Sequence, residues 1–200
     1  MYTSMKYATD QVDEAEMKVM LRELEQVVQV GVSGDVVELG CYEGGSAVEL
    51  QRYIVHYAPE RSLWLYDSFE GLPDKTEEDR SPLGSLFQTG VLKAAQSRLK
   101  RNFVKAGLPI PEITRAWFYE LDPEDLPDQI AFAFLDGDYY ESIMDSLKLV
   151  WPKIPSGGVI VVDDYQNVKL PGVEKAVTKF LSDKNCELKV EASLAVIRLI

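Results

Sequence analysis

From residue 35 onward, short apolar runs alternate with longer segments in which apolar residues recur every three or four positions. The short runs predict buried strands, and the helical period predicts amphipathic helices. A strand followed by a helix, repeated along the chain, favours a doubly wound α/β fold with a mostly parallel sheet. The predicted strands are Val36–Leu39, Ser62–Tyr66, Ile113–Tyr119, Ile130–Leu135 and Val159–Val162. The predicted helices lie near Gly45–His56, Val91–Ala106, Tyr140–Trp151 and Gly172–Leu181.

The two ends of the chain depart from this alternation. Near the N-terminus, Thr9 and Asp10 are predicted to cap a helix that stops at Gly31. Its single apolar stripe either covers the sheet or meets a second subunit in a homodimer, and the sequence leaves both open. At the other end, the extended runs Glu187–Val190 and Leu194–Leu199 flank a short turn. We therefore expect a C-terminal antiparallel hairpin.

Between positions 68 and 90 lies the longest stretch without either period, with prolines and several acidic residues. Loops of this length are uncommon in compact domains and often cover binding sites. The stretch is therefore predicted to be either a lid or a plain solvated loop.

Composition narrows the class of protein. A chain of 200 residues with 46% hydrophobic composition and no linker is expected to form a single domain, with a leading helix in residues 1–34 and a Rossmann-like core in residues 35–200. The net charge of −12 disfavours nucleic acids and anionic membranes as partners. No apolar run reaches the roughly 18 residues of a membrane span. Cys41 and Cys186 lack a metal-binding spacing and fit a reducing compartment, so we expect a cytoplasmic protein.

Acidic residues follow two of the predicted strands. Asp136 comes directly after the fourth strand, and Asp163 and Asp164 come directly after the fifth. The carboxyl ends of parallel strands meet at one sheet edge, so these carboxylates are expected to be neighbours. Their repulsion favours a bound cation, and oxygen ligands favour Mg²⁺ or a similar hard ion. Asp138 either caps the helix that begins at Tyr139 or belongs to this site.

A strand, a glycine turn and a helix start follow one another in residues 36–46. Such a turn lets the backbone approach an adenosine-type cofactor, and Glu38 places a carboxylate at the end of the strand. Tyr42 occupies the position where dinucleotide-binding proteins need a glycine. A pyrophosphate cofactor, and with it a nucleotide-dependent oxidoreductase, is therefore disfavoured.

The second and third predicted strands add further candidates for a nucleoside site. Asp67 ends the second strand, where an acid can accept hydrogen bonds from ribose hydroxyls, although an Asp also serves as a turn residue. Trp117 and Phe118 end the third predicted strand, where they either flank an adenine or belong to the core.

Five segments, ELGCYEGGSA, LYDSFEGLP, AWF, LDGDYYES and PSGGVIVVDDY, resemble in order and spacing the macrocin O-methyltransferase family of class I S-adenosylmethionine-dependent enzymes. The resemblance covers residues 35–181 and implies a seven-stranded sheet with strand order 3-2-1-4-5-7-6. A more distant resemblance to magnesium-dependent catechol-type O-methyltransferases covers the glycine turn and the acidic residues.

The resemblance also implies roles for individual residues. Asp136, Asp163 and Asp164 are expected to hold the metal. Separately from the resemblance, Asp136 and Asp138 are expected to act in catalysis, with Asp138 as the proton acceptor because it is within reach of the metal. Two departures affect the acceptor pocket: Ala116 replaces a glycine of the family, and Tyr139 stands where catechol-type enzymes carry a lysine base. The residues expected to bind the cofactor are Glu38, Gly40, Tyr42, Gly44, Ser46, Asp67, Ser68, Phe69, Trp117, Phe118 and Asp136.

The sequence thus predicts an S-adenosylmethionine-dependent, Mg²⁺-assisted O-methyltransferase. Its expected partner is a small hydroxylated acceptor with a vicinal diol, such as a sugar of a natural product, because a metal can orient two adjacent oxygens and lower the pKa of one. A catechol-type enzyme and a noncatalytic cofactor-binding module are the alternatives. His56 lies in the first crossing helix and is interpreted as structural.

Overall fold

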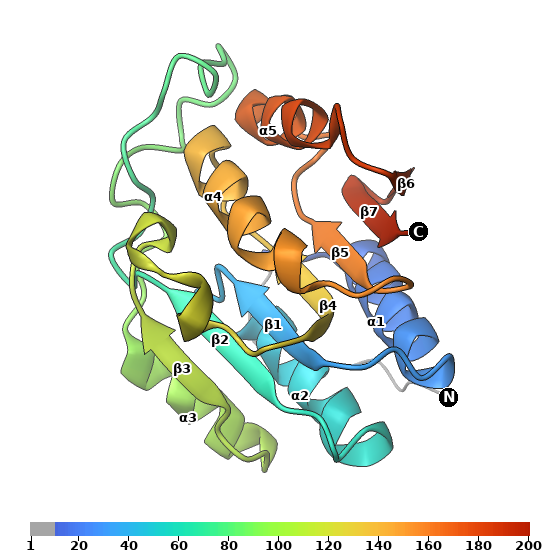
Figure 1. Cartoon of the computed structure of the whole chain (residues 1–200). Coiled ribbons are helices and arrows are strands. Elements are labelled where there is room, and N and C mark those ends of the chain that lie inside the picture. Colours follow the sequence, from blue (N-terminus) through green and yellow to red (C-terminus); the bar gives the residue numbers. More distant parts are fainter. Residues whose placement is uncertain (1–10) are drawn as a thin grey trace.

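In the computed structural model, which describes residues 11–200, seven strands form one sheet with the order β3-β2-β1-β4-β5-β7-β6 (Figure 1). Strands β1 to β5 are parallel, and β7 runs antiparallel between β5 and β6. The expected strand order and C-terminal hairpin are confirmed. The strands are β1 (Asp35–Leu39), β2 (Leu63–Asp67), β3 (Glu112–Arg115), β4 (Ile130–Leu135), β5 (Val159–Val162), β6 (Cys186–Glu191) and β7 (Leu194–Leu199).

Helices cover both faces of the sheet (Figure 1). Successive strand residues point to opposite faces, so Val36 belongs to the core beneath α1, α2 and α3, whereas Val37 belongs to the core beneath α4 and α5. Every residue of β4 is buried because both of its faces are covered. The α-helices are α1 (Glu14–Gln29), α2 (Gly45–Tyr57), α3 (Gln96–Ala106), α4 (Tyr140–Val150) and α5 (Pro171–Leu181). The short 3₁₀ helices are η1 (Phe118–Glu120), η2 (Pro123–Asp125) and η3 (Trp151–Lys153).

Helix α1 resolves one alternative that the sequence left open. Its stripe, including Met20 and Leu24, is buried in the same core as Phe132 and Phe134 of β4, so the stripe covers the sheet. The caps expected at Thr9 and Asp10 lie outside the described residues. Within them, Asp13 caps α1 by accepting hydrogen bonds from the backbone N–H groups of residues 15 and 16.

Two predicted boundaries were wrong. The third strand ends at Arg115, not Tyr119, because the chain turns at Trp117 into the 3₁₀ helix η1. Trp117 and Phe118 therefore lie beyond the strand. Helix α3 begins at Gln96, not Val91, so the segment between β2 and α3 is a loop over all of residues 68–95.

The hairpin turn between β6 and β7 has two residues, Ala192 and Ser193, with φ values of 50° and 69°. Positive φ at both positions matches the twist of antiparallel strands. Within residues 11–200, the helices are all too short or too polar to cross a bilayer.

Candidate functional site

A cavity of about 480 Å³ opens at the carboxyl ends of the parallel strands. Gly40 follows β1, Asp67 ends β2, Asp136 follows β4, and Asp163 and Asp164 follow β5; all five residues line this cavity. Ligands of doubly wound sheets bind in this crevice, and the volume suits a small organic molecule. The sheet topology thus gathers the predicted residues at one place.

The glycine turn after β1 is held by Asp67. Asp67 Oδ2 accepts hydrogen bonds from the backbone N–H groups of Cys41 (3.0 Å) and Tyr42 (2.8 Å). Its Oδ1 accepts a third from the N–H of Phe69 at 2.6 Å. The turn role left open for Asp67 is therefore real, and its carboxylate also borders the cavity next to Tyr42 and Ser68.

Gly40 allows the ends of β1 and β4 to approach. It has a φ of +92°, and a Cβ on it would lie 1.9 Å from the backbone oxygen of Asp136. No other residue type fits this contact without moving the backbone. The glycine therefore fixes the distance between the turn and Asp136.

Glu38 lies beneath the turn and is fully buried. Its Oε1 accepts a hydrogen bond from Ser46 Oγ at 2.6 Å, and its Oε2 has no partner among the described residues. Burial raises the pKa of Glu38 to about 8.

Four of the residues expected to bind a cofactor do not line the cavity: Glu38, Gly44, Ser46 and Phe69.

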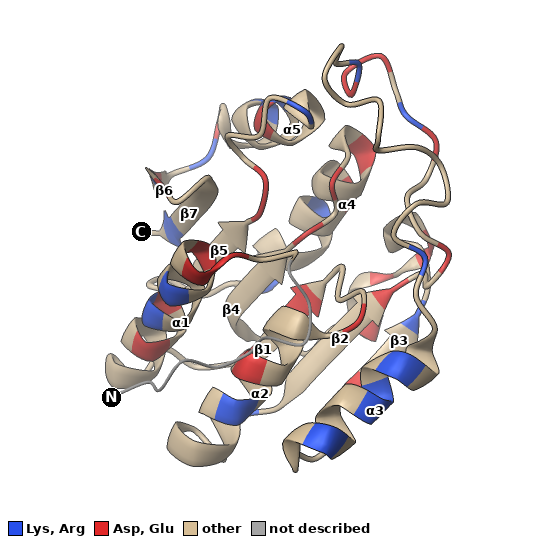
Figure 2. Cartoon of the chain, turned by 180° about the vertical axis from the view of Figure 1, so that it is seen from behind, with Lys and Arg blue, Asp and Glu red and all other residues tan. Residues whose placement is uncertain are grey.

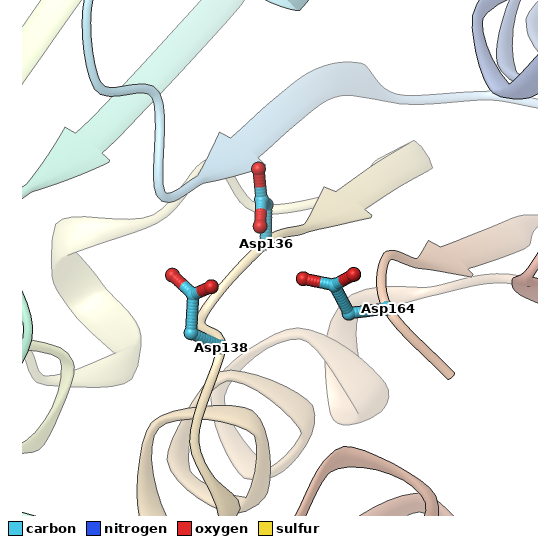
Figure 3. A group of neighbouring side chains, drawn as sticks. All are labelled: Asp136, Asp138 and Asp164. Atoms are coloured by element: carbon cyan, nitrogen blue, oxygen red, sulfur yellow. The ribbon is translucent and has the colours of Figure 1, made fainter. Parts of the chain in front are cut away.

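Three carboxylates converge on the cavity from two strand ends. Asp136, Asp138 and Asp164 each offer an oxygen atom, and these atoms lie within 4.8 Å of one another. Figure 3 shows the three side chains turned toward a common point. Asp138 and Asp164 have positive φ values of 59° and 57°, a conformation that costs free energy and is found mostly at functional sites. We call these three residues the acidic triad.

The carboxylates of this region lose water and repel one another. Burial, followed by the negative charges of Asp164 and Asp67, raises the pKa of Asp138 to about 8. Burial and the charge of Asp163 hold the pKa of Asp136 well above its usual range. Within residues 11–200 we find no cationic side chain paired with the triad, and Asp164 alone accepts a side-chain hydrogen bond, from Asn167 Nδ2 at 2.8 Å.

The positions of Asp138 and Asp163 answer two questions that the sequence left open: which residue caps α4, and which carboxylates converge on one point. Asp138 does not cap α4: the N-cap residue is Tyr139, and the N–H of Tyr140 donates instead to Asp79 Oδ1 at 2.7 Å. Asp163 is also buried and lines the same cavity, and its Oδ1 accepts a hydrogen bond from the N–H of Asp164 at 2.9 Å. The structure thus brings Asp138, rather than Asp163, into the group that shares one point.

The loop of residues 68–95 forms much of the cavity wall that does not belong to the strand ends. The sequence indicated a role for this segment only through the length of the stretch without helix or strand periodicity. Trp117 and Phe118 line the cavity from the 3₁₀ turn, and Trp117 stacks on Tyr119 with ring centroids 6.3 Å apart. Further lining residues that sequence reasoning missed are Gln11, Leu72, Pro73, Thr76, Phe87, Leu92, Glu141, Ser142, Asp145 and Asn167.

Known proteins resemble this chain in sequence and fold. Demethyldecarbamoylnovobiocin O-methyltransferase of Streptomyces niveus is 33% identical over 165 residues, which are 78% of this chain and 62% of that protein. A tetracenomycin-derivative 4'-O-methyltransferase of Streptomyces olivaceus is 32% identical over 148 residues, 71% of this chain and 57% of that protein. The chain thus spans less than two thirds of the length of these curated relatives.

Solved structures lead to the same fold. The O-methyltransferase NovP has a TM-score of 0.80 at 28% identity, covering 92% of this chain and 78% of that chain. The calicheamicin methyltransferase CalS11, at 21% identity, has a TM-score of 0.74 and covers 94% of this chain and 80% of that chain, which supports the fold alone. A model of the macrocin-O-methyltransferase (TylF) family matches residues 5–195. With these motifs, this sheet order and this match, the chain belongs to the macrocin-O-methyltransferase (TylF) family.

Proposed function

We propose that this chain is an S-adenosylmethionine-dependent O-methyltransferase that methylates one hydroxyl of a vicinal diol on a small molecule, such as a sugar of a natural product, with the help of a divalent cation. The observation that carries this proposal is that the glycine turn and the acidic triad share one cavity. The names of the relatives, which describe O-methyltransferases, support it. We further propose that residues 1–200 act as a single domain.

The donor set of the triad fits a hard cation. Carboxylate oxygens without Cys or His favour Mg²⁺ over zinc, and the mutual repulsion of the carboxylates favours a positive charge between them. Asp136 and Asp164 would hold the ion, and Asp163, which lines the same cavity and accepts the hydrogen bond of the Asp164 N–H, would join or support them. A bound cation supplies a Lewis acid that lowers the pKa of a hydroxyl and fixes its direction.

The other wall of the cavity fits a nucleoside with a sulfonium group. Gly40 and Tyr42 present the turn, Asp67 offers the lone pairs left free by its three backbone hydrogen bonds, and Trp117 and Phe118 offer flat apolar surface for an adenine. A cofactor held by these residues would lie beside an acceptor at the acidic triad, and this proximity would contribute much of the rate.

Asp138 is the residue that we propose takes the proton of the acceptor hydroxyl. Its carboxylate faces the same point as the two proposed metal ligands, where the reacting oxygen would lie. Without a cation, burial and the charges of Asp164 and Asp67 raise the pKa of Asp138 to about 8, and a cation bound beside it would lower that pKa and so favour the ionised carboxylate that accepts a proton.

The wall of the cavity also favours an acceptor without negative charge. Among the described residues, the cavity lining contains many acidic side chains and no Lys, Arg or His. A phosphate or carboxylate on the acceptor would therefore be repelled, even after one divalent ion is bound. This supports a neutral polyhydroxylated acceptor.

A panel of sugars and catechols tests the proposal through methyl transfer from radiolabelled S-adenosylmethionine, with Mg²⁺ or with EDTA. We expect transfer onto vicinal diols in Mg²⁺ and little onto analogues with one hydroxyl removed. Equal transfer in EDTA would contradict the role of the cation. Thermal stabilisation by S-adenosylmethionine without transfer to any acceptor would instead support a noncatalytic module.

A further inference from the structure

Helix α4 begins without a cap of its own. Its N-cap residue, Tyr139, makes no side-chain capping hydrogen bond, although the first N–H groups of a helix need acceptors. The acceptor comes from a residue 61 positions earlier: Asp79 Oδ1 accepts the hydrogen bond of the Tyr140 N–H at 2.7 Å. A carboxylate at this position also interacts favourably with the positive end of the helix dipole.

Asp79 is a buried anchor of the loop of residues 68–95. Its exposed fraction is 1%. While Oδ1 binds the start of α4, Oδ2 accepts hydrogen bonds from the backbone N–H of Thr76 (2.9 Å) and from Thr76 Oγ1 (2.7 Å). One side chain thus ties the loop to the helix.

The start of helix α5 is shaped to receive this anchor. A Cβ at position 172 would lie 1.9 Å from Asp79 Oδ1, so Gly172 provides the space that the carboxylate occupies. Two further contacts hold the loop beside it: Ser81 Oγ donates to the carbonyl of Val168 at 2.8 Å, and Lys175 donates to the carbonyl of Glu78. The loop is therefore docked at several points around Asp79.

The anchored position lies directly beside the acidic triad. Asp138 precedes Tyr140 by two residues. Its backbone has the unfavourable φ of 59°, so the contacts that hold residues 139 and 140 in place are needed to keep the Asp138 side chain in its observed direction. Tyr139 between them is buried, and Lys75 of the loop lies over its ring at 5.6 Å from the centroid. The contacts of the loop thus fix the segment that aims the carboxylate of Asp138 at the triad.

We propose that Asp79 is a positioning residue that couples docking of the loop of residues 68–95 to assembly of the acidic triad. With Asp79 bound to the Tyr140 N–H, Asp138 points to the shared site and the loop forms its wall. Without that bond, the loop and Asp138 are both released. This inference rests on the proposed function, because it assigns the triad to a divalent cation.

The test compares Asp79→Asn with wild type and with Glu77→Gln, which removes one negative charge from the exposed side of the same loop. Mn²⁺ alone is the probe, measured by calorimetric titration. We expect the affinity for Mn²⁺ to fall at least fivefold in Asp79→Asn, because the carboxylate of Asp138 no longer faces the ion held by Asp136 and Asp164, and to stay within twofold in Glu77→Gln. Unchanged affinity in Asp79→Asn would overturn the proposal.

Trypsin cleavage after Arg80 gives a second readout that needs no activity. Binding and docking are reciprocally coupled in the proposal, so Mn²⁺ should slow this cleavage in wild type and have no effect in Asp79→Asn. If Asp79→Asn does not fold, Thr76→Val, which removes one of the loop's bonds to Asp79, should give a smaller loss of the same protection. Equal Mn²⁺ protection in wild type and the folded variant would overturn the coupling.

The same variants separate this inference from the proposed function. In the methyl-transfer assay, Asp79→Asn should lower kcat at least tenfold at saturating Mg²⁺ with a smaller change in the KM for S-adenosylmethionine. A wild-type protein that shows Mn²⁺-dependent protection but transfers no methyl group would contradict the proposed function and leave the coupling supported.

Discussion

Two groups of shielded acidic residues in this molecule have opposite surroundings. Glu23 of α1 is 4% exposed, and its two oxygens accept hydrogen bonds from Arg22 and Arg198, each at 2.7 Å. Arg22 also binds Glu191, whose pKa it lowers, together with Lys189, to about 2. Figure 2 shows acidic and basic residues side by side along α1. Each carboxylate of this ion network has its countercharge within the chain.

The acidic triad at the carboxyl ends of the strands forms no ion pair within the described residues, and the only positive charge that lowers the pKa of a member is that of Lys169, which acts on Asp164. Burial raises the pKa of all three carboxylates, Asp138 and Asp164 raise the pKa of Asp136 further, and Asp164 raises that of Asp138; two of the three adopt left-handed backbone conformations. A fold retains such strain and repulsion where function requires it. The comparison shows that a buried carboxylate does not by itself indicate a functional site. A cluster of carboxylates without an ion-pair partner is the stronger indication.

The largest expected effect is on catalysis. Asp136→Asn removes a proposed metal ligand and should lower the rate of methyl transfer at least about a hundredfold. Residues that only support metal ligands typically cost about 10- to 100-fold when they are mutated, so the loss of a ligand should reach or exceed that range. The matched control is Asp163→Asn, which we expect to cost about tenfold, because Asp163 is outside the group of three converging oxygens and supports Asp164 through its N–H. Equal losses in both variants would put Asp163 back among the ligands.

The second-largest expected effect is on the pH dependence of stability, which should have opposite signs for the acidic triad and for the ion network. In the folded, metal-free protein, Asp138 keeps its proton up to about pH 8, whereas its unfolded value is 3.8. The folded state then binds more protons between these values, so the free energy of unfolding should fall as the pH rises from 4 to 8, by up to about 5 kcal/mol. Urea unfolding at each pH measures this trend.

The ion network should respond in the opposite direction. The lowered pKa of Glu191 contributes stability above its unfolded value of 4.5, and this contribution is lost as the pH falls toward 2. Metal-free protein should therefore be most stable near pH 4 to 5, and saturating Mg²⁺ should remove most of the loss at pH 8. A metal-free protein that is most stable at pH 8 would contradict the predicted repulsion in the triad.

The smallest effect concerns the network itself. Glu23→Gln removes the shared charge between two arginines and should destabilise the fold by about 1 kcal/mol, since both arginines are partly exposed and regain water. The control Glu25→Gln, on the exposed side of α1, should change the unfolding free energy by less than about 0.5 kcal/mol. Asp136→Asn should stabilise the metal-free protein instead, and a loss of stability there would break the contrast.

Strand and helix patterns predicted most of the fold because they reflect burial periodicity, a local property. The run at Ile130–Leu135 and the hairpin around Ala192 were recognisable from a few neighbouring residues. The third strand failed at its end because Trp117 and Phe118 are as apolar as strand residues, and the turn there depends on a local hydrogen bond from the Trp117 N–H to Glu120. Periodicity contains no information about that bond.

By itself, the sequence determined the α/β alternation, the acidic edge and the glycine turn, because side-chain period and the geometry of parallel strands follow from local order. The tertiary structure alone decided that Asp138 joins Asp136 and Asp164, that Asp67 holds the turn, and that Asp79 reaches α4. These outcomes depend on backbone angles at single residues and on contacts between distant segments. Such contacts form only when the packed sheet and helices bring those segments together.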